Sequence, residues 1–177
     1  HPELTFVWCS DRPPQAPNFS VFDSHIYEPA YLAGMLAGGL TQRKHLGLIG
    51  GFDMPDIRAI MNAFIAGAQE INPKLRFSSG VIQSWFNPVR AKKMAQAMID
   101  QGVDVFLAIT HSGVVDTAAE NHALAFNCMA NQQTQYPKTV VAAVLWHIEP
   151  VVDAAIAKLR ANTLHAEDFG KLSLMRA

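Results

Sequence analysis

Several features that mark specialised classes of protein are scarce in this sequence. Its 177 residues include two cysteines, Cys9 and Cys128, which cannot build a disulfide scaffold and fit no zinc-ligand spacing. Fourteen Lys and Arg residues balance fifteen Asp and Glu residues without a basic run, which argues against a nucleic-acid or anionic-membrane surface. The longest unbroken apolar run, residues 140–146, is too short to span a bilayer, so we expect no transmembrane segment.

What the sequence does have is the composition of a packed globular protein. It is 50% hydrophobic and 16% charged. A chain of this length can bury a core without metal or disulfide staples, and it fits one domain or two small lobes.

Strand-like and helix-like segments alternate along the chain. Short apolar runs predict strands over residues 4–8, 19–22, 46–51, 77–84, 103–109, 124–126 and 140–145. Helical periodicity and helix-starting prolines predict helices over residues 27–40, 55–71, 88–101, 113–122 and 150–161. This alternation predicts right-handed βαβ units, and therefore an α/β fold with doubly wound parallel sheets. In the first long helix, the spacing of Gly34 and Gly38 indicates close packing against a neighbouring element.

The turns after the strands are the predicted ligand-facing positions, because doubly wound sheets bind ligands beyond the carboxyl ends of their strands. Trp85 and Phe86 directly follow a predicted strand, so at least one ring should project from this edge as a platform for a planar heteroaromatic ligand. Asn87 would place an amide beside that platform. The alternative is that one ring fills the core. Trp146 has the same two interpretations, with the core favoured.

Motifs of catalysis are not apparent. The sequence contains no HExxH pair, GxSxG turn, Walker loop or GxGxxG. His111 beside Ser112 is the nearest approach to a base and a nucleophile, but no carboxylate that would orient the histidine is evident. We therefore expect no catalytic residue, no metal and no cofactor, and we interpret this pair as polar residues that contact a ligand or solvent.

Four stretches of the chain resemble, in order, the basic membrane lipoprotein (BMP) family, the purine- or nucleoside-binding proteins of bacterial ABC importers. Residues 1–8 (HPELTFVW) resemble a strand of the family's first lobe, and residues 27–40 (YEPAYLAGMLAGGL) resemble its Tyr-Leu-Ala-Gly helix. Residues 46–73 (LGLIGGFDMPDIRAIMNAFIAGAQEINP) resemble the strand, turn and helix that open its second lobe. Residues 84–105 (SWFNPVRAKKMAQAMIDQGVDV) resemble its Trp-Phe-Asp-Pro turn with the helix and strand that follow. The similarity looks closest to a proteobacterial branch that favours free purine bases.

The resemblance implies a type I periplasmic-binding-protein-like fold, in which two α/β lobes clamp the ligand between them. It assigns residues 1–43 to the C-terminal part of the first lobe, which this chain covers incompletely. Residues 44–144 would form the second lobe, and residues 145–177 the hinge and return segment.

Carried over by position, the resemblance also implies a set of ligand-binding residues, which comprises Trp85, Phe86, Asn87, His111, Ser112, Asn127 and Trp146. Three of these positions depart from the family pattern. Asn87 replaces the Asp of the Trp-Phe-Asp-Pro turn, the stretch that begins at His111 lacks the family's Asp, and Asn127 lies where many members carry an acidic residue. Ribose diols are best held by charged acceptors, so these losses favour a free base over a nucleoside.

The leading interpretation is therefore a non-catalytic solute-binding protein for a purine-like ligand. The resemblance implies an ABC permease as partner and a periplasmic or extracytoplasmic location, with a lipid anchor on a segment before His1. The alternative is a ligand-sensing domain of the same fold in a signalling or regulatory protein.

Overall fold

The structure, a computed structural model, describes residues 4–10, 12–110 and 113–170. The chain divides into two compact units. We call Ile26–Leu145 the sheet unit, and His1–His25 together with Trp146–Ala177 the terminal unit. No helix within the described ranges is long and apolar enough to cross a membrane.

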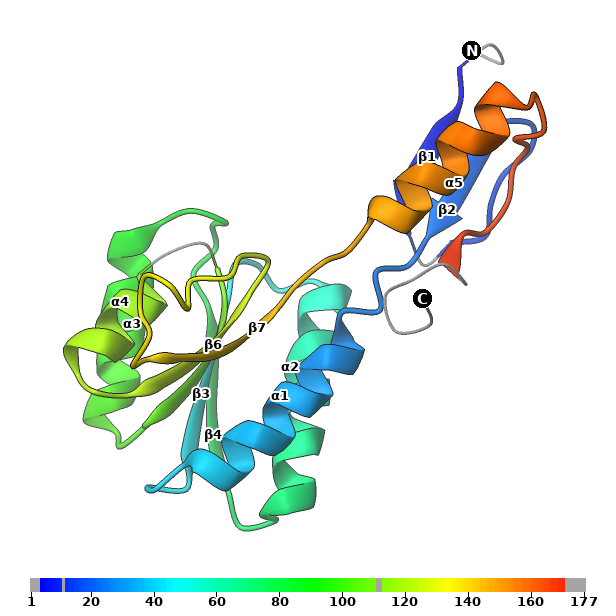
Figure 1. The fold of residues 1–177 in the computed structure, drawn as a ribbon. Helices are drawn as coiled ribbons and strands as arrows, with labels where there is room; N and C mark the ends of the chain where they lie inside the picture. The colour runs from blue at the N-terminus through cyan, green and yellow to red at the C-terminus, as the bar shows by residue number, and fades with distance from the viewer. Residues whose placement is uncertain (1–3, 11, 111–112, 171–177) are drawn as a thin grey trace. The chain divides into compact units, whose positions relative to one another are not determined.

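The sheet unit is built on five parallel strands in the order β4-β3-β5-β6-β7 (Figure 1). These strands are β3 (His45–Gly50), β4 (Arg76–Val81), β5 (Val105–Ile109), β6 (Leu124–Cys128) and β7 (Val140–Val144). The helices are α1 (Tyr27–Leu40), α2 (Pro55–Ile71), α3 (Pro88–Asp100) and α4 (Val114–Glu120). Helices α1 and α2 cover one face of the sheet, and α3 and α4 cover the other (Figure 1). The predicted doubly wound parallel sheet is confirmed.

Alternate side chains of each strand enter two separate apolar cores. On one face, Leu46 and Leu48 of β3 pack in the same cluster as Phe64 of α2. On the other face, Ile49 of β3 and Phe106 of β5 pack in a cluster with residues of α3 and α4. A parallel sheet that is covered on both faces needs apolar residues at every position, which explains the continuous apolar runs in the sequence.

Glycines allow α1 and α2 to pack with their backbones in contact. A Cβ atom built on Gly34 would lie 2.1 Å from the carbonyl oxygen of Phe64, and one on Gly67 would lie 2.0 Å from that of Tyr31. A Cβ on Gly38 would lie 2.6 Å from the carbonyl oxygen of Ala68. The close packing predicted from Gly34 and Gly38 is therefore confirmed.

Strand β4 ends earlier than the sequence predicts, at Val81 rather than at residue 84. The chain leaves the sheet at Gln83, which has a φ of 55°, and the Ser84 N–H donates to the carbonyl of Gly51 at 3.1 Å. Trp85 consequently lies in a turn that is bonded to the turn after β3.

In its described residues, the terminal unit contains two parallel strands and one helix. Strands β1 (Phe6–Cys9) and β2 (Phe19–Phe22) pair with each other, and Val151 and Ala155 of α5 (Glu149–Arg160) are buried with Phe169. The segment 167–169 extends the pairing of β2, because the Val21 N–H donates to the carbonyl of Glu167 at 3.0 Å.

The two units divide the chain differently from the ranges implied by the resemblance. Helix α1 packs on α2 and so groups with the sheet unit, although residues 1–43 were expected to belong to the first lobe. The division places the boundaries at residues 25/26 and 145/146. The lobe boundaries implied by the resemblance stay predictions.

Candidate functional site

The candidate site is the edge of the sheet unit where its parallel strands end, which we call the carboxyl edge. The turn after β3 carries Gly51 and Phe52, and the turn after β4 carries Trp85, Phe86 and Asn87. Because β3 and β4 are neighbours in the sheet, their turns lie next to each other at this edge.

Trp85 is seated on the turn that follows β3. Its ring meets Phe52 edge-on, with centroids 5.2 Å apart and planes at 68°. A Cβ atom on Gly51 would lie 2.5 Å from Trp85 Cε3, so the indole lies directly against that backbone. The side chain is nevertheless 38% exposed. Trp85 is thus held in place by its neighbours and presents part of its ring to solvent, instead of filling the core.

Phe86 is far more exposed than Trp85. It is 69% exposed, and its N–H donates to Ser84 Oγ at 3.2 Å within the same turn. The alternative that one of the two rings fills the core therefore applies to neither. Large exposed aromatic groups beside each other are characteristic of surfaces that bind a partner or ligand.

Asn87 stabilises the start of α3 at this edge. It is the N-cap residue of α3, and its Oδ1 accepts a hydrogen bond from the Arg90 N–H at 3.0 Å. A Cβ atom on Gly113, which has a φ of 91°, would lie 2.6 Å from the carbonyl oxygen of Pro88. Gly113, the residue before α4, thus packs against the start of α3, which directly follows the turn that holds the two aromatic residues.

Asn127, the penultimate residue of β6, carries a buried amide. It is 2% exposed, and its Nδ2 donates to the carbonyl of Ala130 and to Gln132 Oε1, the latter at 3.5 Å. Its Oδ1 is buried and accepts no hydrogen bond from the described residues. The side chain therefore holds the loop after β6 and retains one unused acceptor close to the carboxyl edge.

Three predicted residues remain: His111, Ser112 and Trp146. His111 and Ser112 lie outside the described residues. Trp146 belongs to the terminal unit, where it is exposed and not part of the apolar core that was favoured for it.

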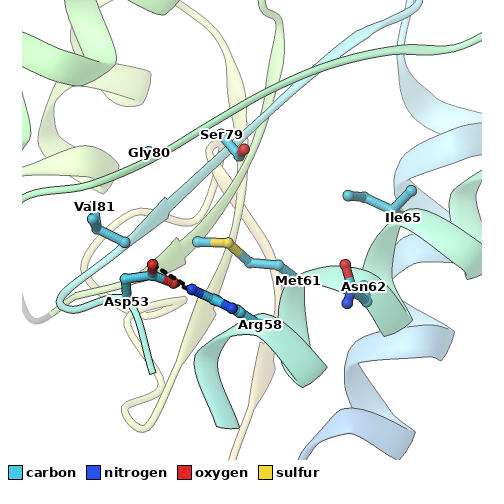
Figure 2. A pocket seen from close by; sticks show the side chains of 8 residues that line it. All are labelled: Asp53, Arg58, Met61, Asn62, Ile65, Ser79, Gly80 and Val81. Carbon is cyan, nitrogen blue, oxygen red and sulfur yellow. Dashed lines mark hydrogen bonds and ion pairs between the residues drawn. The ribbon is translucent and has the colours of Figure 1, made fainter. Parts of the chain in front are cut away.

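An ion pair near the end of β3 was missed by sequence reasoning. Arg58 donates from Nε to Asp53 Oδ1 at 2.5 Å and from Nη2 to Oδ2 at 2.6 Å. These hydrogen bonds hold the pKa of the Asp53 carboxyl below its ordinary value. The pair lines one end of a hollow between α2 and β4 (Figure 2). The only sign of this ion pair in the sequence is that Asp53 lies just before the start of α2 and Arg58 lies in its first turns, five residues later.

Cys128, the last residue of β6, is a titratable group at this edge. Burial raises the pKa of the Cys128 thiol to about 12, which keeps it protonated and unreactive. Among the described residues, no group of three His, Cys, Asp or Glu side chains is placed to hold a metal ion. What the edge offers is exposed aromatic surface beside uncharged polar groups, and this suits a flat ligand.

A family model described as "ABC transporter substrate-binding protein PnrA-like" matches residues 2–169. The chain belongs to this family. It is 31% identical over 131 residues to a purine-binding protein of Brucella abortus. The aligned region covers 73% of this chain and 37% of the relative. It is 36% identical over 88 residues to a putative glucose-binding protein of an ABC transporter of Haloferax volcanii, covering 50% of this chain and 22% of the relative.

The same fold occurs in a solved ABC transporter solute-binding protein of Aeropyrum pernix, with a TM-score of 0.82 and 20% sequence identity. That match covers 96% of this chain and 52% of the solved one. The type I periplasmic-binding-protein-like fold is thereby confirmed, as is the resemblance to the BMP family. The chain spans about half the length of this solved relative, and less of the two curated relatives.

Proposed function

We propose that this chain forms part of a non-catalytic solute-binding protein that binds a purine-like ligand and delivers it to an ABC importer. Membership of the PnrA-like family supports the substrate-binding role. The name of the Brucella relative supports the class of ligand. The single observation that carries the proposal is Trp85, an indole seated on Gly51 and Phe52 that is still 38% exposed at the carboxyl edge.

The uncharged surroundings of Trp85 favour a free base over a nucleoside. Its neighbours in the turn are Ser84, Phe86 and Asn87, none of which carries a charge. The carboxylate of Asp53, in the adjoining turn, is already engaged by Arg58. Stacking on an aromatic ring recognises the flat face of a base, and amides can read its edge. A ribose would need charged acceptors that these residues do not supply.

The family also supports the remaining parts of the proposal. We place the protein in the periplasm or another extracytoplasmic location, held by a lipid anchor, with the permease of an ABC importer as its partner and no nucleic-acid partner. The formal net charge of the sequence is −1 at pH 7, and a protein without excess positive charge is not suited to a polyanionic partner.

Calorimetric titration of the protein with adenine, guanine, hypoxanthine, adenosine, riboflavin and glucose tests the proposal. Micromolar binding of a free base, with adenosine much weaker, is expected. Tight binding of glucose instead, or of no compound by the folded protein, would overturn the purine assignment. Equal affinity for adenine and adenosine would overturn the preference for a free base.

Trp85→Ala connects the binding to the site. Removing the ring should weaken base binding by about 1–3 kcal/mol, which is the typical contribution of one aromatic group stacked on a base. Val89→Ala is the matched control, because Val89 is an exposed apolar residue in the first turn of α3 and lies close in sequence. The same affinity in the two variants would remove Trp85 from the ligand site.

A further inference from the structure

Strand β4 is an edge strand, and one side of its backbone has no partner in the sheet. The Arg76 N–H donates to the carbonyl of Lys44 at 2.8 Å, and the Ile82 N–H donates to that of Gly50 at 3.0 Å. The register with β3 is continuous between these two bonds. Because backbone groups alternate in direction along a strand, those of Phe77, Ser79 and Val81 point away from β3. No other strand of the described ranges pairs with β4.

This edge lacks the devices that usually protect an edge strand. Natural proteins block such edges with charged side chains, prolines or β-bulges. From Phe77 to Val81 the strand carries two serines and a glycine, with no charge and no proline. Its only charged residue, Arg76, lies at the start of the strand, and the ladder contains no bulge. Within the described part of the sheet unit, the sequence and the ladder of β4 therefore contain nothing that blocks pairing of its outer side with another strand.

A hollow lies beside the outer side of β4. It has a volume of about 320 Å³ and lies between α2 and the segment Ser79–Val81, with the Asp53–Arg58 ion pair at one end (Figure 2). Met61 and Ile65 of α2 and Val81 of β4 supply its apolar lining. Phe77 packs against the core beneath α2, so the side chains of Phe77, Ser79 and Val81 lie on the α2 face of the sheet. A strand added next to β4 would deliver every second side chain to the side of this hollow.

We propose that β4 pairs with β4 of a second copy of this chain, antiparallel and about a two-fold axis at Ser79. In this register Ser79 faces the partner's Ser79, and the two residues exchange both of their outward hydrogen bonds. Val81 faces the partner's Phe77, which places an aromatic side chain beside the apolar lining of the hollow. The two five-stranded sheets become one continuous sheet of ten strands across the two copies.

The sequence of β4 fits a copy of itself in this register. Ser78 faces the partner's Gly80, so that small side chains meet on the opposite face and none is too large for close approach. Arg76 faces the partner's Ile82, and the two Arg76 residues are six positions apart along the ladder, or about 20 Å. Like charges that face each other directly would destabilise the pairing, and here none do.

A cysteine placed on the two-fold axis tests the register directly. In a Cys9→Ser background, Ser79→Cys should form a disulfide-linked dimer under mild oxidation, because hydrogen-bonded antiparallel residues have Cα atoms about 5.5 Å apart, within the range a disulfide spans. Lys93→Cys is the control, since Lys93 is exposed on α3, which covers the opposite face of the sheet. Equal cross-linking of the two variants would overturn the proposal.

Sedimentation of the unlinked protein over a wide concentration range gives a second test. The wild type and Ser79→Ala should dimerise alike, because alanine keeps the outward N–H. Ser79→Pro removes that N–H from both copies without breaking a bond to β3, so it should weaken dimerisation about thirtyfold while circular dichroism shows an intact fold. A wild type that stays monomeric, or a proline variant that dimerises like the wild type, would overturn the pairing.

Discussion

Replacing Gly34 by alanine should destabilise the sheet unit by about 2 kcal/mol, because the added methyl group meets the backbone of a neighbouring helix. The ideal Cβ position lies 2.1 Å from the carbonyl oxygen of Phe64 and 2.8 Å from its carbonyl carbon. Ordinary contact begins at 3.4 Å, so α1 and α2 would have to separate by as much as 1.3 Å (3.4 − 2.1). Backbone atoms cannot rotate away as a flexible side chain can, so the whole helix pair must shift.

Two opposing effects set the magnitude. Alanine is favoured over glycine inside a helix by about 1 kcal/mol. Overpacking in a well-packed interface costs about 1–3 kcal/mol, and the upper part of this range or more applies when the obstacle is backbone. Separation of the helices also loosens the packing around Phe64, which is fully buried. The overpacking cost outweighs the gain in helix propensity.

Gly39→Ala is a matched control in the same helix. The nearest atom to its added Cβ is Ile71 Cγ2 at 4.0 Å, which leaves room for a methyl group. This variant gains helix propensity without a clash, so it should be neutral or stabilised by up to about 1 kcal/mol. Urea unfolding followed by circular dichroism compares the two midpoints. A Gly34→Ala protein as stable as Gly39→Ala would refute the close contact between α1 and α2.

Four further predictions concern the carboxyl edge and the two cysteines. Gly51→Ala should weaken ligand binding and change the fluorescence of Trp85, because the new Cβ would lie 2.5 Å from the indole; unchanged affinity and fluorescence would show that the ring does not depend on this seat. Below pH 9, a thiol reagent should modify Cys9, which is exposed, and leave Cys128 unmodified until the protein unfolds. Burial raises the pKa of Cys128 from 9.0 to about 12, so the contribution of this thiol to the free energy of unfolding should be complete below pH 9 and be lost as the pH rises toward 12. Cys128→Ala should remove that part of the pH dependence. Asn87→Ala should cost about 1 kcal/mol through the lost helix cap, whereas Asn87→Asp keeps the acceptor and should cost little in urea unfolding.

Much of the fold followed from local patterns in the sequence. The apolar run that includes Leu46 and Leu48 predicted a buried strand, and Pro55 and Pro88 predicted the starts of two helices, all of which the structure contains. These signals are local because strand burial and the tolerance of proline at a helix start depend on residues close in the chain. The end of β4 was placed three residues too late, since it depends on a bond from Ser84 to the distant Gly51.

Local sequence patterns predicted only part of the candidate site. The sequence indicated that Trp85 and Phe86 follow a strand and face a ligand-binding edge, and it left open whether either ring fills the core. That both are exposed, and that Trp85 rests on Gly51 and Phe52, depends on a turn that is 34 residues away in the chain (85 − 51). The use of Asn87 as a helix cap could have been read from its position before Pro88, because asparagine is favoured at such positions.

The sequence by itself thus determined the alternation of strands and helices, the α/β class, the family and the aromatic character of the edge. Each of these depends on residue type and on spacing over one element or its immediate neighbours. The tertiary structure alone decided that α1 packs on α2 within the sheet unit, that β4 is the edge strand, and that a hollow lies between it and α2. These features depend on which surfaces meet across long stretches of chain, where the outcome is set by shape and close approach, as at Gly34 and Gly67, and not by local pattern.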